Sequence, residues 1–378
     1  MLVSRTVRTS RLAVIATAVS AAVISVLATS AAAAPPPTVS VGPGTLPGKT
    51  FVAAPPPGAT GPDDITSLAV PGVDNGRLMI WVAYQNGINP DGTPGTPGGP
   101  TQSTVAGYDA TTGTPVATIA VTGKVDGLTA DPVGKSLIAT VNEDLNSAFN
   151  LIQLPGGAVT TYQYSPSPAV SGNGGTDSIA VRGSQIFVVH SNPGDTMQPA
   201  EYQVTLDSSV HTAFLTPVFY DNDTATDAVT RMQVTLALTD PDTNSFMPAD
   251  SPRFPGQLAT ISQGDGKIIF ASHLQFSPKL TVLSLTDNVA GNVPPIDGMA
   301  VATAERGTLY VVDASAGTIT ALSTRGWPAG TVFVGEPSDN GNPLIGTLNL
   351  FTGKITPLGN TFGSPKGLLF IPSGHPGN

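Results

Sequence analysis

The sequence predicts an all-β fold, a single β-propeller built from four-stranded antiparallel blades, and three observations support this prediction. The chain of 378 residues holds 42 glycines and 36 prolines, which disfavour long helices and suit short strands joined by turns. Short runs of β-branched and aromatic residues recur along it, bounded by Gly, Asp or Pro. A phrase in which Asp-Gly leads into an apolar run occurs twice, at Asp126 and at Asp297.

The repeated phrase predicts the inner strand of each blade, the strand that lines the propeller axis. A four-strand unit that recurs along a chain is typical of this fold. Six related runs favour six blades, and residues 221–254, which fit either an extra blade or a long excursion, leave seven possible. The predicted inner strands are DDITSLAV from Asp63, VDGLTAD from Val125, TDSIAV from Thr176, PGQLATIS from Pro255, IDGMAVA from Ile296 and SPKGLLFIP from Ser364.

A second strand is predicted directly after each of the first five inner strands. Two-strand units with tight turns follow several of them, as at Thr112-Gly113 and Thr352-Gly353, where Gly tolerates a positive φ. The last run, GLLFIP, is expected to close the ring against N-terminal strands, which removes an exposed edge. The predicted second strands are RLMIWVAY from Arg77, SLIATV from Ser136, QIFVVH from Gln185, KIIFASH from Lys267 and TLYVVD from Thr308.

The N-terminal residues predict export. Residues 1–34 combine a basic start, an apolar stretch over residues 12–28 and small residues suited to cleavage, which is typical of a Sec-type signal peptide and of a secreted protein. An uncleaved signal that tethers the protein to a membrane is the alternative. Residues 35–61 are expected to form a Pro/Gly/Ala-rich linker, residues 62–373 the propeller and residues 374–378 a disordered tail. No later segment is apolar enough to span a membrane.

Composition excludes several classes of function. The chain has no cysteine, so it offers no disulfide, thiolate metal site, cysteine nucleophile or lipoprotein anchor. Its net charge of −10 makes nucleic acid an unsuitable partner. We expect a monomer that needs no cofactor, with a protein, a glycan or a small molecule as its partner.

The recurring pattern, Asp/Pro-Gly-[LIM]-[AT]-[VA] followed by a turn and [LI]-[FY]-[VA]-[VA], resembles the YVTN, NHL and gluconolactonase-like propellers of exported bacterial proteins. The resemblance covers Asp63 to Pro372 and implies the fold. Gluconolactonase-like propellers hold a metal through Glu, Asn and Asp near the axis. Here Glu143 is the acidic residue near an inner-strand end that could begin such a set, and Glu305 and Glu336 are not placed to join it. The His-Glu arrangement of streptogramin lyases finds no match.

The first candidate site is a set of Asp residues at the heads of the predicted inner strands. Because these strands surround one axis, their heads should meet at the mouth of a channel, where carboxylates bind a hard cation or a cationic ligand. The alternative is that each Asp caps its own turn. Two inner strands carry Gly256 and Lys366 at the equivalent place, so the ring is incomplete. The candidates are Asp64, Asp126, Asp177 and Asp297.

The second candidate site lies in TDPDTNSFMPAD, residues 239–250. Asp240, Asp242 and Asn244 have the alternate spacing of calcium loops, so calcium is a possible ligand. The pattern departs from the EF-hand, because Ser245 stands where Gly is needed. An ordinary polar turn is the alternative interpretation.

Histidines form the third candidate site. His190 and His273 each end a predicted second strand, and a pair at comparable positions of neighbouring blades could bind a metal or act as a general base. Local hydrogen bonding is the alternative. Trp81 is expected in the core, whereas Trp327 lies in a loop and is a candidate contact residue.

Taken together, these features predict an exported propeller that acts as a binding or scaffold module at or outside the cell envelope. Its partner is expected on the face that carries the loops over residues 87–103 and 239–256. The alternative function is a metal-dependent hydrolase, lactonase or lyase that uses the central channel.

Overall fold

Strands are the regular elements of this protein. The computed structural model describes residues 48–49, 53, 55–69, 76–131, 133, 135–168, 174–193, 197–275, 277–287, 292–338 and 342–374, all within one compact unit. The signal peptide predicted for residues 1–34, most of the predicted linker and most of the predicted tail lie outside the described residues. In the described part, no helix has the length and apolar character needed to cross a membrane.

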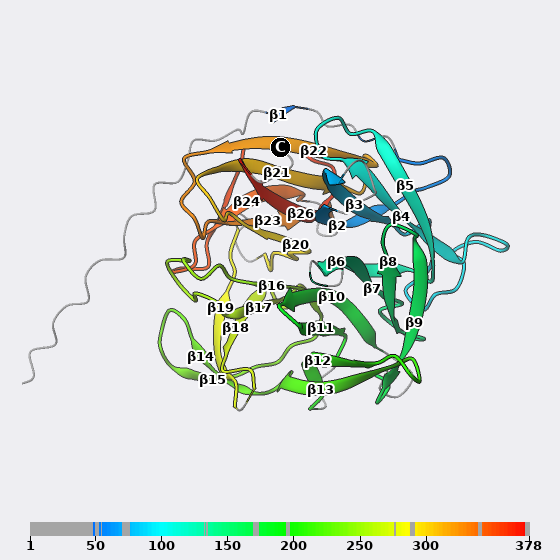
Figure 1. Ribbon diagram of the computed structural model, residues 1–378. Helices are drawn as coiled ribbons and strands as arrows, with labels where there is room; N and C mark the ends of the chain where they lie inside the picture. The colour runs from blue at the N-terminus through cyan, green and yellow to red at the C-terminus, as the bar shows by residue number, and fades with distance from the viewer. Residues whose placement is uncertain are drawn as a thin grey trace, which may run out of the picture. The chain divides into compact units, whose positions relative to one another are not determined.

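The strands form antiparallel groups of four, numbered here in chain order (Figure 1). Groups 2 and 3 share one eight-stranded sheet, because their outermost strands, β9 and β13, pair in parallel. Group 1 contains β2 (Pro62–Ala69), β3 (Leu78–Tyr84), β4 (Gln102–Asp109) and β5 (Pro115–Thr122). Group 2 contains β6 (Val125–Asp131), β7 (Ser136–Val141), β8 (Ala148–Gln153) and β9 (Ala158–Ser165). Group 3 contains β10 (Gly175–Arg182), β11 (Gln185–Ser191), β12 (Pro199–Asp207) and β13 (Thr212–Tyr220).

Group 4 places residues 221–254, which the sequence left open. Two short strands extend the outer side of its sheet, where β14 pairs in parallel with β19, and the remaining part of the segment supplies the inner strand. The first part of the segment is therefore an excursion on the outer side of the group 4 sheet. Its later part contains the inner strand of the same sheet. Group 4 contains β16 (Pro241–Phe246), β17 (Leu258–Ser262), β18 (Lys267–Ser272) and β19 (Lys279–Ser284), with β14 (Thr224–Asp227) and β15 (Gln233–Thr235) outside them.

Groups 5 and 6 exchange chain segments. The inner strand β20 pairs with β23, while β21, which comes next in the sequence, pairs with β22 and with the C-terminal β26. The N-terminal β1 forms the outer edge of group 6, so this sheet joins the two ends of the propeller. Group 5 contains β20 (Gly298–Val301), β23 (Val332–Glu336), β24 (Leu344–Leu348) and β25 (Ile355–Pro357). Group 6 contains β26 (Pro365–Pro372), β21 (Arg306–Asp313), β22 (Thr318–Arg325) and β1 (Gly48–Lys49).

The inner strands close a ring, which makes this unit a β-propeller. Each of β2, β6, β10, β16, β20 and β26 contacts the next in that order, and β26 contacts β2 (Figure 1). Clusters of buried apolar side chains fill the space between every two neighbouring groups of the described structure. Burial of these two-sided sheets is the main stabilising contribution to the ring.

Glycine in the repeated Asp-Gly phrase permits close contact between neighbouring inner strands. A Cβ on Gly127 of β6 would meet the backbone oxygen of Asp177 on β10 at 2.5 Å, and one on Gly298 of β20 would meet that of Lys366 on β26 at 1.7 Å. Any side chain there would force the strands apart. The Asp-Gly phrase therefore recurs because the packing of the inner strands requires the Gly. The Asp that precedes this Gly is placed at the strand head as a consequence.

Two strand assignments made from the sequence were wrong. PGQLATIS is the second strand of group 4, β17, and the inner strand is β16, in the stretch that was interpreted as a polar turn or calcium loop. TLYVVD, β21, does not pair with IDGMAV but belongs to the neighbouring sheet. The first error also shifts KIIFASH from second to third strand, β18, although β17 and β18 do pair. The second error arises because adjacency in sequence was taken for pairing. Trp81 is fully buried as expected, whereas Trp327, expected as a contact residue, is 2% exposed and packs against Phe333.

Candidate functional site at the axial mouth

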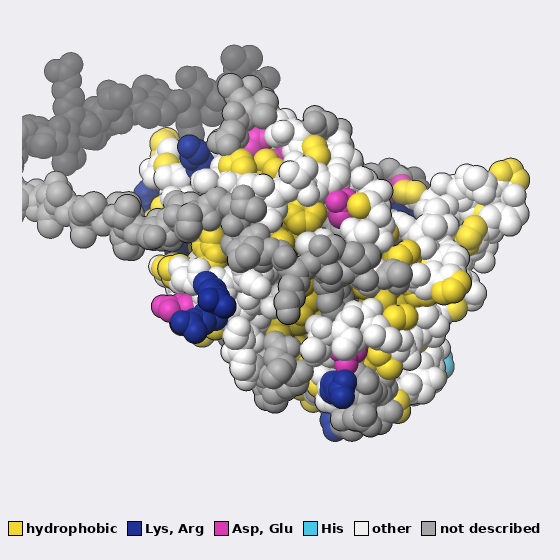
Figure 2. Space-filling model, turned by 90° about the horizontal axis from the view of Figure 1, so that it is seen from above, with side chains coloured by type: hydrophobic (Ala, Val, Ile, Leu, Met, Phe, Trp, Pro, Cys, Tyr) yellow, Lys and Arg dark blue, Asp and Glu magenta, His cyan; other side chains and the backbone are white. Residues whose placement is uncertain are grey.

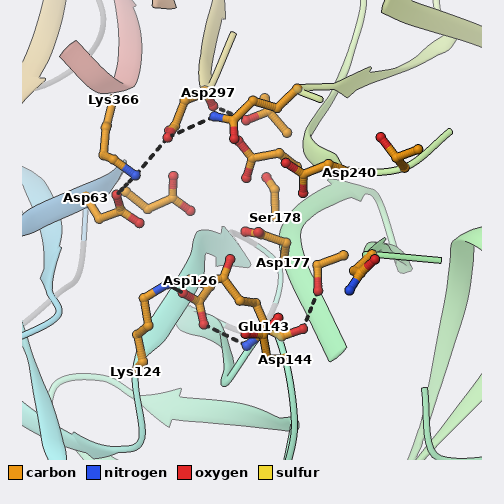
Figure 3. Close-up of a pocket in the computed structure, with 17 residues that line it drawn as sticks. Asp63, Lys124, Asp126, Glu143, Asp144, Asp177, Ser178, Asp240, Asp297 and Lys366 are labelled. Carbon is orange, nitrogen blue, oxygen red and sulfur yellow. Dashed lines mark hydrogen bonds and ion pairs between the residues drawn. The ribbon is translucent and has the colours of Figure 1, made fainter. Parts of the chain in front are cut away.

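The heads of the inner strands converge on a cavity of about 460 Å³ at one end of the propeller axis. We call this cavity the mouth. Figure 3 shows side chains from several inner strands pointing into the same space. Nine carboxylates and two lysines of the described residues line it: Asp63, Asp64, Asp126, Glu143, Asp144, Asp177, Asp240, Asp242, Asp297, Lys124 and Lys366.

The strand-head Asp residues singled out in the sequence all line this mouth. Two of them also accept backbone N–H groups: Asp64 Oδ2 from Leu128 at 2.7 Å, and Asp126 Oδ2 from Glu143 at 3.1 Å. The first of these bonds reaches across to the neighbouring inner strand, so it is not a cap of the Asp64 turn. The four residues that the structure brings together are Asp64, Asp126, Asp177 and Asp297.

The candidates from the second site divide between two environments. Asp240 and Asp242 line the mouth, at the head of β16, so Asp242 rather than Gly256 occupies the strand-head place in group 4. Asn244 is 5% exposed, and its Nδ2 donates to Glu201 Oε1 at 2.7 Å in the seam between groups 3 and 4. The three side chains therefore do not form one loop.

Lys124 neutralises one side of the mouth. Its Nζ lies 2.5 Å from Asp126 Oδ1 and also contacts Glu143 Oε1. Burial lowers the pKa of Lys124, but the charges of Asp126 and Glu143 outweigh that effect, so its pKa is raised and it stays charged. The pKa of Glu143 is lowered despite its burial, because Lys124 stabilises the carboxylate.

Lys366 neutralises the adjacent part of the mouth. Its Nζ lies 2.8 Å from Asp297 Oδ2 and 3.2 Å from Asp63 Oδ1, and Figure 3 shows it between these two carboxylates. Gln85 donates to Asp63 Oδ2 at 2.7 Å and so ties group 1 to the same cluster. Lys124, Lys366, Asp63, Asp126, Glu143 and Asp297 are called the lysine half below.

Asp177, Asp240 and Asp242 form the other side, called the carboxyl half below. In the described structure no lysine or arginine lies within ion-pair distance of any of the three. Burial raises the pKa of Asp240 to about 6, and the charge of Glu143 adds to the shift. Burial and then the nearby charges of Asp242 and Glu143 raise the pKa of Asp177 well above its usual range.

Asp177 and Asp242 are hydrogen-bonded to each other across the boundary between groups 3 and 4. Burial and the mutual repulsion of the two groups raise the pKa of the pair. Two carboxyl groups in contact are stabilised by a proton between them, so the pair binds protons at a higher pH than free aspartates do.

The histidines do not meet. His190 is buried in β11 with Nδ1 2.8 Å from the Pro199 carbonyl oxygen, and burial lowers its pKa. His273 follows β18, the third strand of group 4, and its exposed ring contacts only Ser272 among the hydrogen bonds assigned to it. The expected equivalence of the two positions was wrong, because the two strands hold different ranks in their sheets. Neither lines the mouth.

Sequence reasoning missed Lys124 and Asp144, although each adjoins a residue that it did consider. Lys124 precedes the Val125-Asp126 strand head, and Asp144 follows Glu143. Asp63 was used only as the start of a strand. Charged residues flanking a strand head are the signal that would have found them. The face in Figure 2 carries few and scattered charged side chains, which contrasts with the concentration of charge in the mouth.

No family model matches the chain. None of the curated proteins matches it either. Solved structures do: a protein assigned as a gluconolactonase shares 11% identity with a TM-score of 0.46, covering 85% of this chain and 86% of that one. Streptogramin B lyase shares 13% identity with a TM-score of 0.41, covering 86% and 91%. A protein assigned as a 6-phosphogluconolactonase from Bacteroides fragilis shares 13% with a TM-score of 0.43, covering 81% and 86%.

These likenesses concern the fold at most. With identities of 11–13% they say nothing about activity, so the site is interpreted from its own residues.

Proposed function

We propose that this propeller is a binding module that takes a positively charged organic ligand in its axial mouth. The observation that supports it is the carboxyl half: Asp177, Asp240 and Asp242 share one side of a cavity without a basic partner in the described structure. Closely spaced buried carboxylates repel one another, and an ammonium or guanidinium group relieves this repulsion. A volume of about 460 Å³ suits a small organic molecule.

An organic cation fits this mouth better than a bare metal ion does. Calcium takes six to eight oxygen ligands at about 2.3–2.6 Å. Among the described residues, no three acidic or histidine side chains are arranged to hold one metal ion. The alternative of a metal-dependent hydrolase needs such a set, so binding is the function we propose. Calcium is therefore included as a comparison ligand in the titration below.

The test is isothermal titration at pH 7.5 with 1,4-diaminobutane, and with 1,4-butanediol and calcium chloride as comparisons. We expect the diamine alone to bind, and D177N/D242N to weaken its binding at least about tenfold, since each buried charge contact is worth over 1.4 kcal/mol. The matched control is D207N, which removes an exposed carboxylate outside the mouth. Equal binding of the diol, tighter binding of calcium, or no effect of D177N/D242N would contradict the proposal.

We also propose that this binding takes place outside the cytoplasm. The support is the signal-like pattern of residues 1–34 in the sequence. Mass spectrometry of the protein recovered from culture medium should find a new N-terminus near Ala33 or Pro35. An intact Met1 on a membrane-bound protein would instead favour the tethered alternative.

A further inference from the structure

A second cavity of about 340 Å³ adjoins the mouth along the propeller axis. All six inner strands line it, with residues that follow their strand heads, and the two cavities share the lining residues Asp64, Ser178, Thr243 and Asp297. The two cavities are therefore direct neighbours. Because the inner strands all start at the mouth, the second cavity lies toward their carboxyl ends.

The second cavity differs in chemistry from the mouth. No lysine, arginine or glutamate of the described residues lines it, and its carboxylates are Asp64 and Asp297, at the junction. The rest of its polar lining consists of threonine, serine and asparagine side chains. Four inner strands contribute an apolar side chain that is only partly buried, and these are Val181, Phe246, Val301 and Phe370. Because residues of a strand alternate between its two faces, these four side chains occupy equivalent positions on their strands. Each of them is left partly uncovered beside the cavity.

A buried polar atom between the two regions has no partner. Asn244 is 5% exposed and lines the second cavity, two residues after Asp242 of the mouth. Its Nδ2 donates to Glu201, but its Oδ1 accepts no hydrogen bond in the described structure. Buried acceptors are usually satisfied, so this carbonyl needs an N–H donor that the described residues do not supply.

We propose that the ligand is an amphiphilic amine, with its ammonium head among Asp177, Asp242 and Asn244 and an unbranched apolar chain in the second cavity. This inference rests on the proposed function, because the head occupies the cation site described above. An ammonium head supplies three N–H donors, which suit two carboxyl groups and an amide carbonyl. From Asp242 to Phe246, β16 spans about 13 Å, which gives the chain a defined course along the axis.

The test is a homologous series of butylamine, hexylamine and octylamine, titrated in the same way as the diamine. Each added methylene that enters the cavity should tighten binding by up to about fourfold, the equivalent of about 0.8 kcal/mol. Octanol, which has the chain without the charge, should bind far more weakly than octylamine. The double variant V181S/V301S should flatten the dependence of affinity on chain length.

A matched control is V210S, which alters an exposed valine outside both cavities. Equal affinity for butylamine and octylamine would overturn the inference while leaving cation binding intact. Octanol binding as tightly as octylamine would also overturn it, since the head would then contribute nothing. Failure of every amine, including 1,4-diaminobutane, would overturn the proposed function itself. Circular dichroism of each variant separates lost binding from lost folding.

Discussion

The two halves of the mouth treat buried negative charge in opposite ways. In the lysine half, Lys124 and Lys366 each contact two carboxylates and compensate part of their charge. Burial and the charge of Glu143 nevertheless still raise the pKa of Asp126.

In the carboxyl half no lysine of the described structure is within ion-pair distance. Burial raises the pKa values of Asp177, Asp242 and Asp240, so protons supply much of the compensation. Lysines are fixed parts of the fold, whereas protons exchange with solvent. The comparison indicates that the lysine half maintains the ring and the carboxyl half is open to a ligand.

The largest expected effect breaks the lysine half. In Lys366→Met, two carboxylates that are 11% and 14% exposed lose their cation, and removal of one partner from a buried pair costs about 3 kcal/mol. Urea denaturation at pH 7 should show this loss in the free energy of unfolding. Lys279→Met, at an exposed position on β19, serves as the control and should change stability little. If Lys366→Met were as stable as the wild type, the lysine half would not maintain the ring.

A smaller effect of opposite sign is expected in the carboxyl half. The folded-state pKa values of Asp177 and Asp242 are raised, so between about pH 4 and those values the folded protein binds more protons than the unfolded chain. Its stability therefore falls as the pH rises through this window. In D177N/D242N this loss should be smaller, which makes the variant more stable than wild type at pH 8 by on the order of 1 kcal/mol.

Denaturation of both proteins at pH 5 and pH 8 checks this prediction. Part of the pH dependence should persist in the variant below about pH 6, because Asp240, with a pKa of about 6, is unchanged. A variant that is less stable than wild type at pH 8 would show that the carboxyl pair stabilises the fold, and the contrast between the halves would fail.

The sequence predicted the architecture well because the repeat carries a packing requirement. Gly127, Gly298 and Gly367 are needed where neighbouring inner strands touch. The equivalent position in β2 and β10 is held by Ile65 and Ser178.

The inner strand β16 was missed because its sequence, PDTNSF, lacks the apolar run that follows the strand head in the other inner strands. The Thr243 hydroxyl donates to the Asp297 carbonyl oxygen of the next strand, so the contact is made by a different residue type. A search for apolar runs could not find β16.

The site was predictable only in part, because its defining contact is not local. Asp126 and Asp177 could be expected at the mouth, since each precedes an apolar run at a strand head. Asp242 was recognised as a possible ligand, but in a separate calcium loop. Its contact with Asp177 depends on which strand of group 4 is innermost, and that follows from packing among sheets distant in sequence.

Proton release on ligand binding tests the central claim most directly. A cation that binds the carboxyl half favours the charged carboxylates and lowers their pKa values, so at pH 6 protons should leave the protein. Titration with 1,4-diaminobutane in two buffers of different ionisation enthalpy measures this release. We predict a net release from the wild type and a smaller one from D177N/D242N. Binding with no proton release, or the same release from both proteins, would contradict the account.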